Sequence, residues 1–398
     1  MIEPAVPLSL YVHMPWCVRK CPYCDFNSHQ LHSSAPATGY IDALIDDFET
    51  ELPWLAGRRI DTVFFGGGTP SLFGPEDFAR LLDALKRQIA FAGDAEITLE
   101  ANPGTIERGR FAGYRDAGIT RVSLGAQSFA PRALERLGRI HTAGDTHRAV
   151  EELHAADIGN FNLDLMYALP QQTLEEAIVD VRTACALGPA HISYYQLTLE
   201  PGTVFHSRPP PLPDEDLAWE MLAQGQQILA DEGFTQYEVS AYAKDGARCR
   251  HNLNYWQFGD YAGVGAGAHG KLSMSVPHHI LRTAKPKQPR DYQDRLAAPP
   301  AAVPAALGRT ALVPRAIGER RLVATVDLPF EFMLNALRLN EGFAGRDFES
   351  RTGLSLNSIE PGLRQARDRG LLEVTARGWR PTELGRKFLN DLQAGFLG

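Results

Sequence analysis

Short apolar runs alternate with longer amphipathic stretches through the first half of this 398-residue chain. The amphipathic stretches, such as 40–55 and 75–89, repeat their apolar residues at helical spacing. The six apolar runs, predicted to be strands, are 8–13, 61–66, 96–101, 119–125, 161–169 and 191–199. Six strand-then-helix units imply parallel strands with right-handed crossovers. The expected fold is therefore α/β, with a partial (β/α)6 barrel.

Polar and glycine-rich positions follow the ends of these predicted strands. A cysteine-rich loop follows the first strand, and the sequence GGGTPS follows the second. Glu100 and Asn102 close the third strand, Gln127 follows the fourth, and Asp164 lies in the fifth. Because the carboxyl ends of parallel barrel strands meet at one rim, we expect these groups to form a common site.

Three cysteines on the first loop, Cys17, Cys21 and Cys24, are spaced C-x3-C-x2-C. A [4Fe–4S] cluster normally takes four cysteine thiolates, so three would leave one iron open to a non-protein ligand. A redox pair of Cys21 and Cys24 is an alternative that leaves Cys17 unused. A zinc site completed by His13 or His29 is another, because structural zinc takes four ligands.

Composition shifts suggest how the remaining chain is divided. The first predicted unit, 1–235, is a barrel with the cluster and its ligand site, and the second, 236–297, is an extension that contains HNLNYW and a glycine-rich stretch. An Ala- and Pro-rich linker, 298–320, and a C-terminal domain, 321–398, follow. The last unit is predicted to hold three helices, a hairpin and a final helix, at 328–340, 345–352, 357–369, 371–381 and from 382. This order is typical of a winged helix, although the acidic chain without a clear basic stripe favours a simple cap on the barrel.

Charge and cysteine usage narrow the class of protein. A net charge of −8 argues against a nucleic-acid-coating protein. Five cysteines, three of them in one loop, do not form the pattern of a secreted disulfide framework, and free thiolates suit a reducing cytosol. The N-terminal sequence lacks the features of a signal peptide, and no run of about 18 apolar residues occurs. We therefore expect a cytoplasmic protein, with peripheral membrane association and a homodimer left open.

The cysteine spacing, followed by GGGTP after the second strand, resembles the radical S-adenosylmethionine (SAM) superfamily. The chain also resembles the oxygen-independent coproporphyrinogen III oxidases and their relatives. The matching segments, between residues 11 and 343, are YVHMPWCVRKCPYCDF, FFGGGTPS, LGAQSF, LGRIHTAGD, NLDLMYALPQQT, LTLEPGT, RHNLNYW, GVGAGAHG and FEFMLNALRLNEGF. The resemblance implies that Cys17, Cys21 and Cys24 hold a [4Fe–4S] cluster whose open iron binds SAM.

The same resemblance implies a SAM pocket. Its residues would be Tyr11, Tyr23, Gly67, Gly68, Thr69, Glu100, Gln127, Arg139 and Asp164. In this pocket the backbone of the glycine run would contact the amino group of SAM. The Arg139 guanidinium suits the SAM carboxylate, and the Asp164 carboxylate suits the diol of the SAM ribose. The alternative for Glu100 and Asp164 is that they cap helices.

The chain resembles two groups of related proteins that differ in function: the oxidases and the HemW-type heme chaperones. The oxidases carry a further cysteine two residues after the third, where this chain has Phe26, and a longer arm before the cysteine loop. HNLNYW, residues 251–256, resembles a chaperone motif. His251 would then be an axial heme ligand, with Cys249 and His269 as alternatives, and Tyr255 would offer the porphyrin a flat face.

The resemblance therefore implies a heme chaperone that binds a [4Fe–4S] cluster, SAM and heme, and that hands heme to apoproteins. The alternative is the oxidase, which decarboxylates coproporphyrinogen III to protoporphyrinogen IX. A third possibility is that the cluster only tunes dimerisation or heme binding, with SAM bound but rarely cleaved. The sequence leaves open whether the protein is an enzyme, which protein donates electrons and which accepts heme.

Overall fold

The computed structural model describes residues 6–31, 37–55, 57–104, 109–244, 246–275, 278–298 and 316–397. Its centre is a run of six parallel strands, which confirms the predicted α/β barrel. In spatial order these strands are β1 (Leu8–Met14), β4 (Arg59–Gly67), β5 (Ala90–Ala101), β6 (Arg121–Gln127), β7 (Phe161–Tyr167) and β8 (His191–Gln196). They are buried on both faces and therefore read in the sequence as nearly continuous apolar runs.

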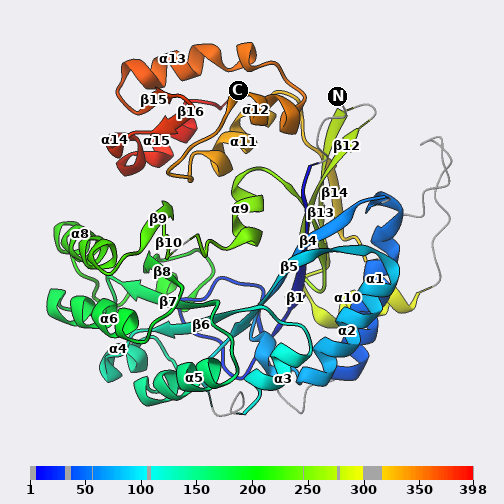
Figure 1. Cartoon of the computed structure of the whole chain (residues 1–398), viewed down its shortest axis with the longest axis vertical. Coiled ribbons are helices and arrows are strands. Elements are labelled where there is room, and N and C mark those ends of the chain that lie inside the picture. The colour runs from blue at the N-terminus through cyan, green and yellow to red at the C-terminus, as the bar shows by residue number, and fades with distance from the viewer. Residues whose placement is uncertain are drawn as a thin grey trace.

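Helices cover the outer face of the barrel (Figure 1). They are α1 (Ala37–Leu55), α2 (Pro75–Gln88), α3 (Phe111–Asp116), α4 (Pro131–Arg136), α5 (Ala143–Ala155), α6 (Leu174–Ala186) and α8 (Glu215–Asp231). Capping side chains define several starts: Thr142, Thr173 and Asp214 each accept a hydrogen bond from a backbone N–H in the first turn of the following helix. Capping residues are local features of the sequence, so helix starts of this kind can be predicted without knowledge of the fold.

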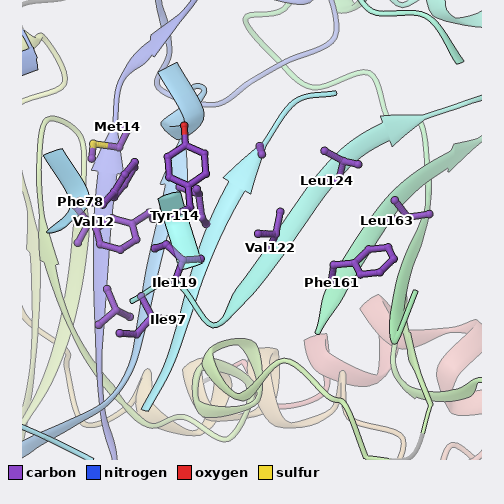
Figure 2. Packing of buried hydrophobic residues seen from close by; sticks show 14 of the residues in the cluster. Val12, Met14, Phe78, Ile97, Tyr114, Ile119, Val122, Leu124, Phe161 and Leu163 are labelled. Atoms are coloured by element: carbon purple, nitrogen blue, oxygen red, sulfur yellow. The ribbon is translucent and has the colours of Figure 1, made fainter. Parts of the chain in front are cut away.

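The main hydrophobic core lies between the strands and these helices. Figure 2 shows Val12 and Met14 of β1 on the same side as Phe78 of α2 and Tyr114 of α3, with Val122 of β6 and Phe161 of β7 farther along the sheet. These side chains are almost completely buried. The core therefore fixes the register of the strands and, with it, the positions of the residues at their carboxyl ends.

The sheet continues beyond the parallel strands at both edges. One edge adds β10 (Ala241–Ala243) and β9 (Thr235–Glu238), and the other adds β11 (Asp260–Val264), β12 (His269–Ser275), β13 (His278–Ala284) and β14 (Glu319–Leu322). Only β11 of these edge strands is parallel to its barrel neighbour, β1. Short elements complete this part: β2 (Trp16–Cys17), β3 (His29–Gln30), η1 (Pro70–Leu72), α7 (Val204–Ser207), α9 (Arg250–Trp256) and α10 (Pro289–Ala297).

The C-terminal part is mainly helical and has its own core, as predicted. It contains α11 (Leu328–Ala336), α12 (Gly345–Thr352), η3 (Leu356–Ser358), α13 (Glu360–Asp368), the hairpin of β15 (Leu372–Thr375) and β16 (Gly378–Pro381), α14 (Glu383–Lys387) and α15 (Leu389–Ala394). Its core also takes in Phe258 and Ile280, which precede the predicted linker. Most of that linker lies outside the described residues, and positions 319–320 belong to β14.

Contacts join the C-terminal part to the barrel rim. The Arg338 guanidinium lies over the Trp256 ring, 4.4 Å from its centroid, and its Nη2 pairs with Glu238 at 3.1 Å. Arg248 and Glu341 form a further ion pair at 2.8 Å. The C-terminal helices therefore lie above α9 (Figure 1). Within the described ranges, no helix is both long and apolar enough to cross a membrane.

Candidate functional site

The cysteine loop leaves the carboxyl end of β1 and is held against the end of β4. The backbone N–H of Gly68 donates to Met14 O, and that of Thr69 donates to Trp16 O, both at 2.7 Å. A Cβ on Gly68 would lie 2.5 Å from Trp16 O, closer than side-chain carbons come to a carbonyl oxygen. Gly67 has a φ of +115°, which favours glycine. The glycine run therefore lets the two loops pack closely.

A polar cavity of about 470 Å³ opens at the carboxyl ends of the strands. It brings together ten of the predicted residues: Cys17, Cys21, Cys24, Tyr23, Gly68, Thr69, Glu100, Gln127, Arg139 and Asp164. Its size lies within the usual range for cofactor sites, about 300–1,000 Å³. The barrel topology thus collects residues that are up to 147 positions apart, from Cys17 to Asp164, around one space.

Two predicted SAM residues do not line this cavity. The side chain of Tyr11 lies in a neighbouring cavity, where its hydroxyl bonds to His13 Nδ1 at 3.0 Å, because alternate residues of β1 share a face. Gly67 lies behind the wall and donates its N–H to Glu100 Oε2 at 3.1 Å. The N–H groups of Gly67, Gly68 and Thr69 donate to Glu100, Met14 and Trp16. Because an amino group donates hydrogen bonds, the backbone of this run could receive one only at its carbonyl oxygens.

Two carboxyl groups face the cavity, that of Glu100 from β5 and that of Asp164 from β7, with β6 between the two strands. Burial, with a contribution from the nearby Asp164, raises the pKa of Glu100 to about 7. Burial also raises the pKa of Asp164, although Asn162 and Ser123 donate hydrogen bonds to its carboxyl group at 2.8 and 3.3 Å. Neither residue caps a helix, because each lies in a strand. Glu100 can therefore be neutral or charged near neutral pH.

Several cavity residues were missed by the reading of the sequence. Ser123, Ser193 and Tyr195 line the wall, and the Tyr195 hydroxyl donates to Gln127 Oε1 at 2.8 Å. Gln127 has a φ of +65°, unusual for a residue with a side chain, at an irregularity in the β6–β7 pairing. A single serine or tyrosine within a strand belongs to no recognisable sequence motif. Only the strand register could have shown that Ser123, Ser193 and Tyr195 face the cavity.

The three thiols line one wall of this cavity, which fits a cluster bound through three corners. Burial raises the pKa values of Cys17 and Cys24, as expected for thiols partly removed from water before they bind a metal. His13 does not suit the zinc alternative, because its Nδ1 bonds to Tyr11 and its Nε2 to Asn27 O at 2.8 Å. A cluster bound here would be the redox group, and the polar wall facing it would hold the organic cofactor.

A second cavity, of about 780 Å³, adjoins the first. Six residues line both: Asp25, Phe26, Ser28, Glu100, Asn252 and Trp256. Phe26, at the position of the oxidases' extra cysteine, is 58% exposed at this shared wall. Aromatic rings and histidines line the rest of the second cavity, among them Tyr255, Tyr261, His251 and His269. Such a lining suits a large, flat, apolar ligand.

His251 is held in a defined protonation state at this second cavity. Thr62 Oγ1 donates to Ser9 Oγ at 2.7 Å, so the contact of 3.0 Å between Thr62 Oγ1 and His251 Nδ1 needs a proton on Nδ1. No hydrogen bond to Nε2 forms within the described part of the chain. Burial, with the nearby Arg121, lowers the pKa of His251 to about 3. The ring is therefore neutral, with its lone pair on Nε2.

The other predicted heme contacts differ in their surroundings. Cys249 is fully buried, and its thiol donates to Glu96 Oε1 at 3.6 Å, so it does not reach the cavity. His269 is exposed and lines the second cavity. The glycine-rich stretch is part of the sheet edge: a Cβ on Gly265 or Gly267 would collide with His13 or Asn27. Gly265 is thus packed against protein atoms, whereas Gly267 lies close to Asn27 and also lines the second cavity.

The barrel, the three-cysteine loop and the polar cavity define a radical SAM protein. A radical SAM superfamily profile matches residues 11–184, and a HemN C-terminal domain profile matches residues 325–388. Membership of this superfamily implies a [4Fe–4S] cluster and SAM. The fold resembles that of coproporphyrinogen III oxidase (HemN) from Escherichia coli, with a TM-score of 0.79 at 21% identity, over 99% of this chain and 91% of that one.

Sequence comparison gives the narrower family. Heme chaperone HemW of Escherichia coli is 46% identical over 391 residues, and that of Haemophilus influenzae is 47% identical over 395 residues. Each alignment covers 98% of both chains. A mitochondrial radical SAM domain-containing protein 1 of Mus musculus is 40% identical over 268 residues, 66% of this chain and 60% of that protein. The chain therefore belongs to the heme chaperone HemW family.

Proposed function

We propose that the protein is a radical SAM heme chaperone, which binds a [4Fe–4S] cluster, SAM and heme and transfers heme to acceptor apoproteins. Three thiols and the polar wall around Glu100 would hold the cluster and SAM. Heme would lie in the second cavity, with His251 Nε2 as an axial ligand. The observation that carries the heme assignment is the position of the His251 imidazole, which lines a large aromatic cavity with its Nδ1 3.0 Å from Thr62 Oγ1.

The contact between His251 Nδ1 and the Thr62 hydroxyl supports this assignment. A histidine that binds a metal through one ring nitrogen usually donates the other N–H to a fixed oxygen. Thr62 Oγ1 supplies such an oxygen, and Phe64 packs against the ring with a centroid separation of 5.0 Å. Since the pKa of His251 is about 3, protons would not compete with iron for Nε2 above mildly acidic pH.

The alternative function, oxidative decarboxylation of coproporphyrinogen III, has less support. The likeness to the oxidase HemN, at 21% identity, concerns the fold. At the position where the oxidases are expected to carry a further cysteine, this chain has Phe26, whose ring lies at the wall between the two cavities. The full-length relatives named heme chaperone favour the carrier function. Whether SAM is cleaved during transfer is a separate question, which an assay for 5′-deoxyadenosine answers.

Further parts of the proposal concern organisation and location. We propose four units, at 1–235, 236–297, 298–320 and 321–398, with the last as a winged-helix-like cover. The units from 236 onward would help to enclose the heme cavity. We place the protein in the cytoplasm as a homodimer with peripheral membrane association, which size-exclusion chromatography and vesicle flotation test directly.

An anaerobic titration with hemin, followed by absorption spectroscopy, tests heme binding and its ligand together. We expect the wild-type protein to bind one hemin per chain with a shifted Soret band. His251→Ala should weaken binding about 10- to 100-fold or change the spectrum. His206→Ala is the matched control, because His206 lies on α7, bonds to Leu199 O at 3.1 Å and lines neither cavity.

The outcomes of this titration separate the two claims. If neither the wild type nor the control takes up hemin, the protein is not a heme chaperone. If all three proteins bind hemin with the same affinity and spectrum, heme binding stands but His251 is not its ligand, and His269→Ala is the next variant.

A further inference from the structure

Two of the three cluster cysteines are joined by a continuous chain of hydrogen bonds. The Thr69 hydroxyl donates to Cys17 Sγ at 3.5 Å, and Asn102 Nδ2 donates to Thr69 Oγ1 at 3.0 Å. The amide oxygen of the same residue, Asn102 Oδ1, accepts a hydrogen bond from Arg139 Nη2. Arg139 Nη1 then donates to Cys21 Sγ at 3.7 Å. Asn102, at the carboxyl end of β5, is therefore the centre of a path that runs from one sulfur to the other.

The direction of each hydrogen bond follows from the chemistry of the amide. Asn102 has one donor end and one acceptor end, and this path uses both. Because Asn102 donates to Thr69 Oγ1, the single proton of that hydroxyl is free to point toward Cys17. Because Asn102 Oδ1 accepts from Arg139 Nη2, the guanidinium is held with Nη1 toward Cys21, while Gly125 O accepts from Nη2 at 3.0 Å.

The third cysteine has a different environment. Cys24 Sγ lies 4.0 Å from Ser28 Oγ and has no member of this path as a neighbour. Near Cys24, the Lys20 ammonium contacts the backbone of the loop instead, and its Nζ donates a hydrogen bond to Phe26 O at 3.1 Å. The Asn102 path therefore supplies hydrogen-bond donors selectively to the sulfurs of Cys17 and Cys21.

We infer that Asn102 is a positioning residue for the cluster, which directs the Thr69 hydroxyl and the Arg139 guanidinium onto two of its thiolate ligands. Hydrogen bonds to cluster sulfurs spread their negative charge, and this makes reduction of the cluster easier. Asn102 thereby holds the reduction potential of the cluster at a less negative value than the three thiolates alone would give. The inference rests on the cluster and SAM part of the proposed function and not on heme binding.

A redox titration of the reconstituted, SAM-free protein, monitored by electron paramagnetic resonance, tests this inference. Thr69→Val removes the hydroxyl but keeps the shape, and its midpoint potential should move to more negative values. Thr69→Ser restores the donor and should return the potential toward that of the wild type. Asn102→Ala should also lower the potential, with iron remaining at about four atoms per chain.

The double variant separates positioning from an independent effect. If Asn102 acts through Thr69 and Arg139, then Asn102→Ala should shift the potential less in the Thr69→Val background than in the wild type. Ser207→Ala is the matched control and should shift the potential least, because the Ser207 hydroxyl donates to Val204 O at 2.9 Å and the residue lines neither cavity.

Two results would overturn the inference. One is an unchanged potential in Asn102→Ala with its iron intact. The other is equal potentials for Thr69→Val and Thr69→Ser, which also decides the matter if Asn102→Ala fails to retain iron. An iron content near zero in the wild type would instead contradict the cluster, and with it this part of the proposed function.

Discussion

Burial sets the protonation states of individual side chains at this site. The carboxyl of Glu100 and the imidazole of His251 are both shifted toward their neutral forms, the first with a pKa of about 7 and the second with a pKa of about 3. Near neutral pH, Glu100 is thus poised to change charge when a ligand enters, whereas His251 stays neutral. The two residues lie at the second cavity, and Glu100 also borders the first.

Glu100→Gln tests the raised pKa. The folded protein holds the Glu100 proton more tightly than the unfolded chain, whose pKa is near 4.5. The resulting stabilisation is complete below about pH 4.5 and is lost as the pH rises through 7. The free energy of unfolding of Glu100→Gln should therefore rise relative to wild type by about 1–3 kcal/mol between pH 5 and pH 8. Urea denaturation of the apoprotein at several pH values measures this, and a pH-independent difference would contradict it.

Thr62→Val tests how His251 is oriented. The valine cannot accept the Nδ1 proton, so the favoured tautomer and ring orientation should be lost. Hemin affinity should fall about 10- to 100-fold, while Thr62→Ser should keep most of it. The titration described above measures both variants. Equal affinities for the valine and serine variants would show that this hydrogen bond does not matter for heme.

Single-residue roles were predictable only where a motif carried them. Cys17, Cys21 and Cys24 stand in a spacing that few functions require, and Arg139 and Asp164 lie in family segments. Thr62 carries no such pattern, and Asn102 was expected at the barrel rim from its place after a strand, without any indication of its hydrogen-bond partners. Their partners, His251 and Thr69, come from other parts of the chain and meet them only through strand register. Sequence reasoning has no access to contacts of this kind.

At the scale of elements, the parallel strands and their helices followed from the sequence, whereas the sheet edges did not. Apolar periodicity and capping residues are local, so β1 and α5 could be predicted from their own residues. The glycine-rich stretch was noted in the sequence, but its packing was not predicted. A Cβ on Gly263 of β11 would lie 2.0 Å from His269 O on β12, and one on Gly265 would lie 2.4 Å from His13 O on β1. Helix α9 also went unpredicted, because Glu96 on β5 accepts hydrogen bonds from the first backbone N–H groups of α9.

Gly68→Ala tests the close packing of the β4 end against the cysteine loop. The added methyl group would lie 2.5 Å from Trp16 O and must displace the loop. We expect a loss of about 1–3 kcal/mol in the free energy of unfolding and less iron per chain after reconstitution. Gly93→Ala, where a methyl group meets no atom within 4 Å, is the control. Full iron incorporation and unchanged stability in Gly68→Ala would contradict the packing role.

At the scale of the whole molecule, the hydrophobic core of the C-terminal part includes residues from the barrel side of the predicted linker. Phe258 and Ile280 belong to the C-terminal core although they precede the predicted linker. Arg338 reaches from the C-terminal part to Trp256, a residue that lines both cavities. A division by composition alone could not reveal this shared core, because the contacting residues are distant in sequence. The C-terminal part is therefore placed to influence access to both cavities.

Arg338→Ala tests this coupling. The change removes both the ring contact with Trp256 and the ion pair with Glu238. Backbone amides of α9 should exchange with solvent faster, by roughly 5- to 30-fold for a loss of about 1–2 kcal/mol in local stability. Hydrogen exchange followed by mass spectrometry measures this. Arg346→Ala, whose side chain is exposed, is the control, and equal α9 exchange in both variants would contradict the coupling.

The assay that most directly tests the central claim supplies the reconstituted protein with dithionite, SAM and coproporphyrinogen III under anaerobic conditions. The same preparation should carry its cluster and bind hemin. A heme chaperone should leave coproporphyrinogen III unchanged, because the role that we propose for its second cavity is to hold finished heme. Turnover to protoporphyrinogen IX, seen by chromatography of the porphyrins, would contradict the account and assign the protein to the decarboxylating relatives.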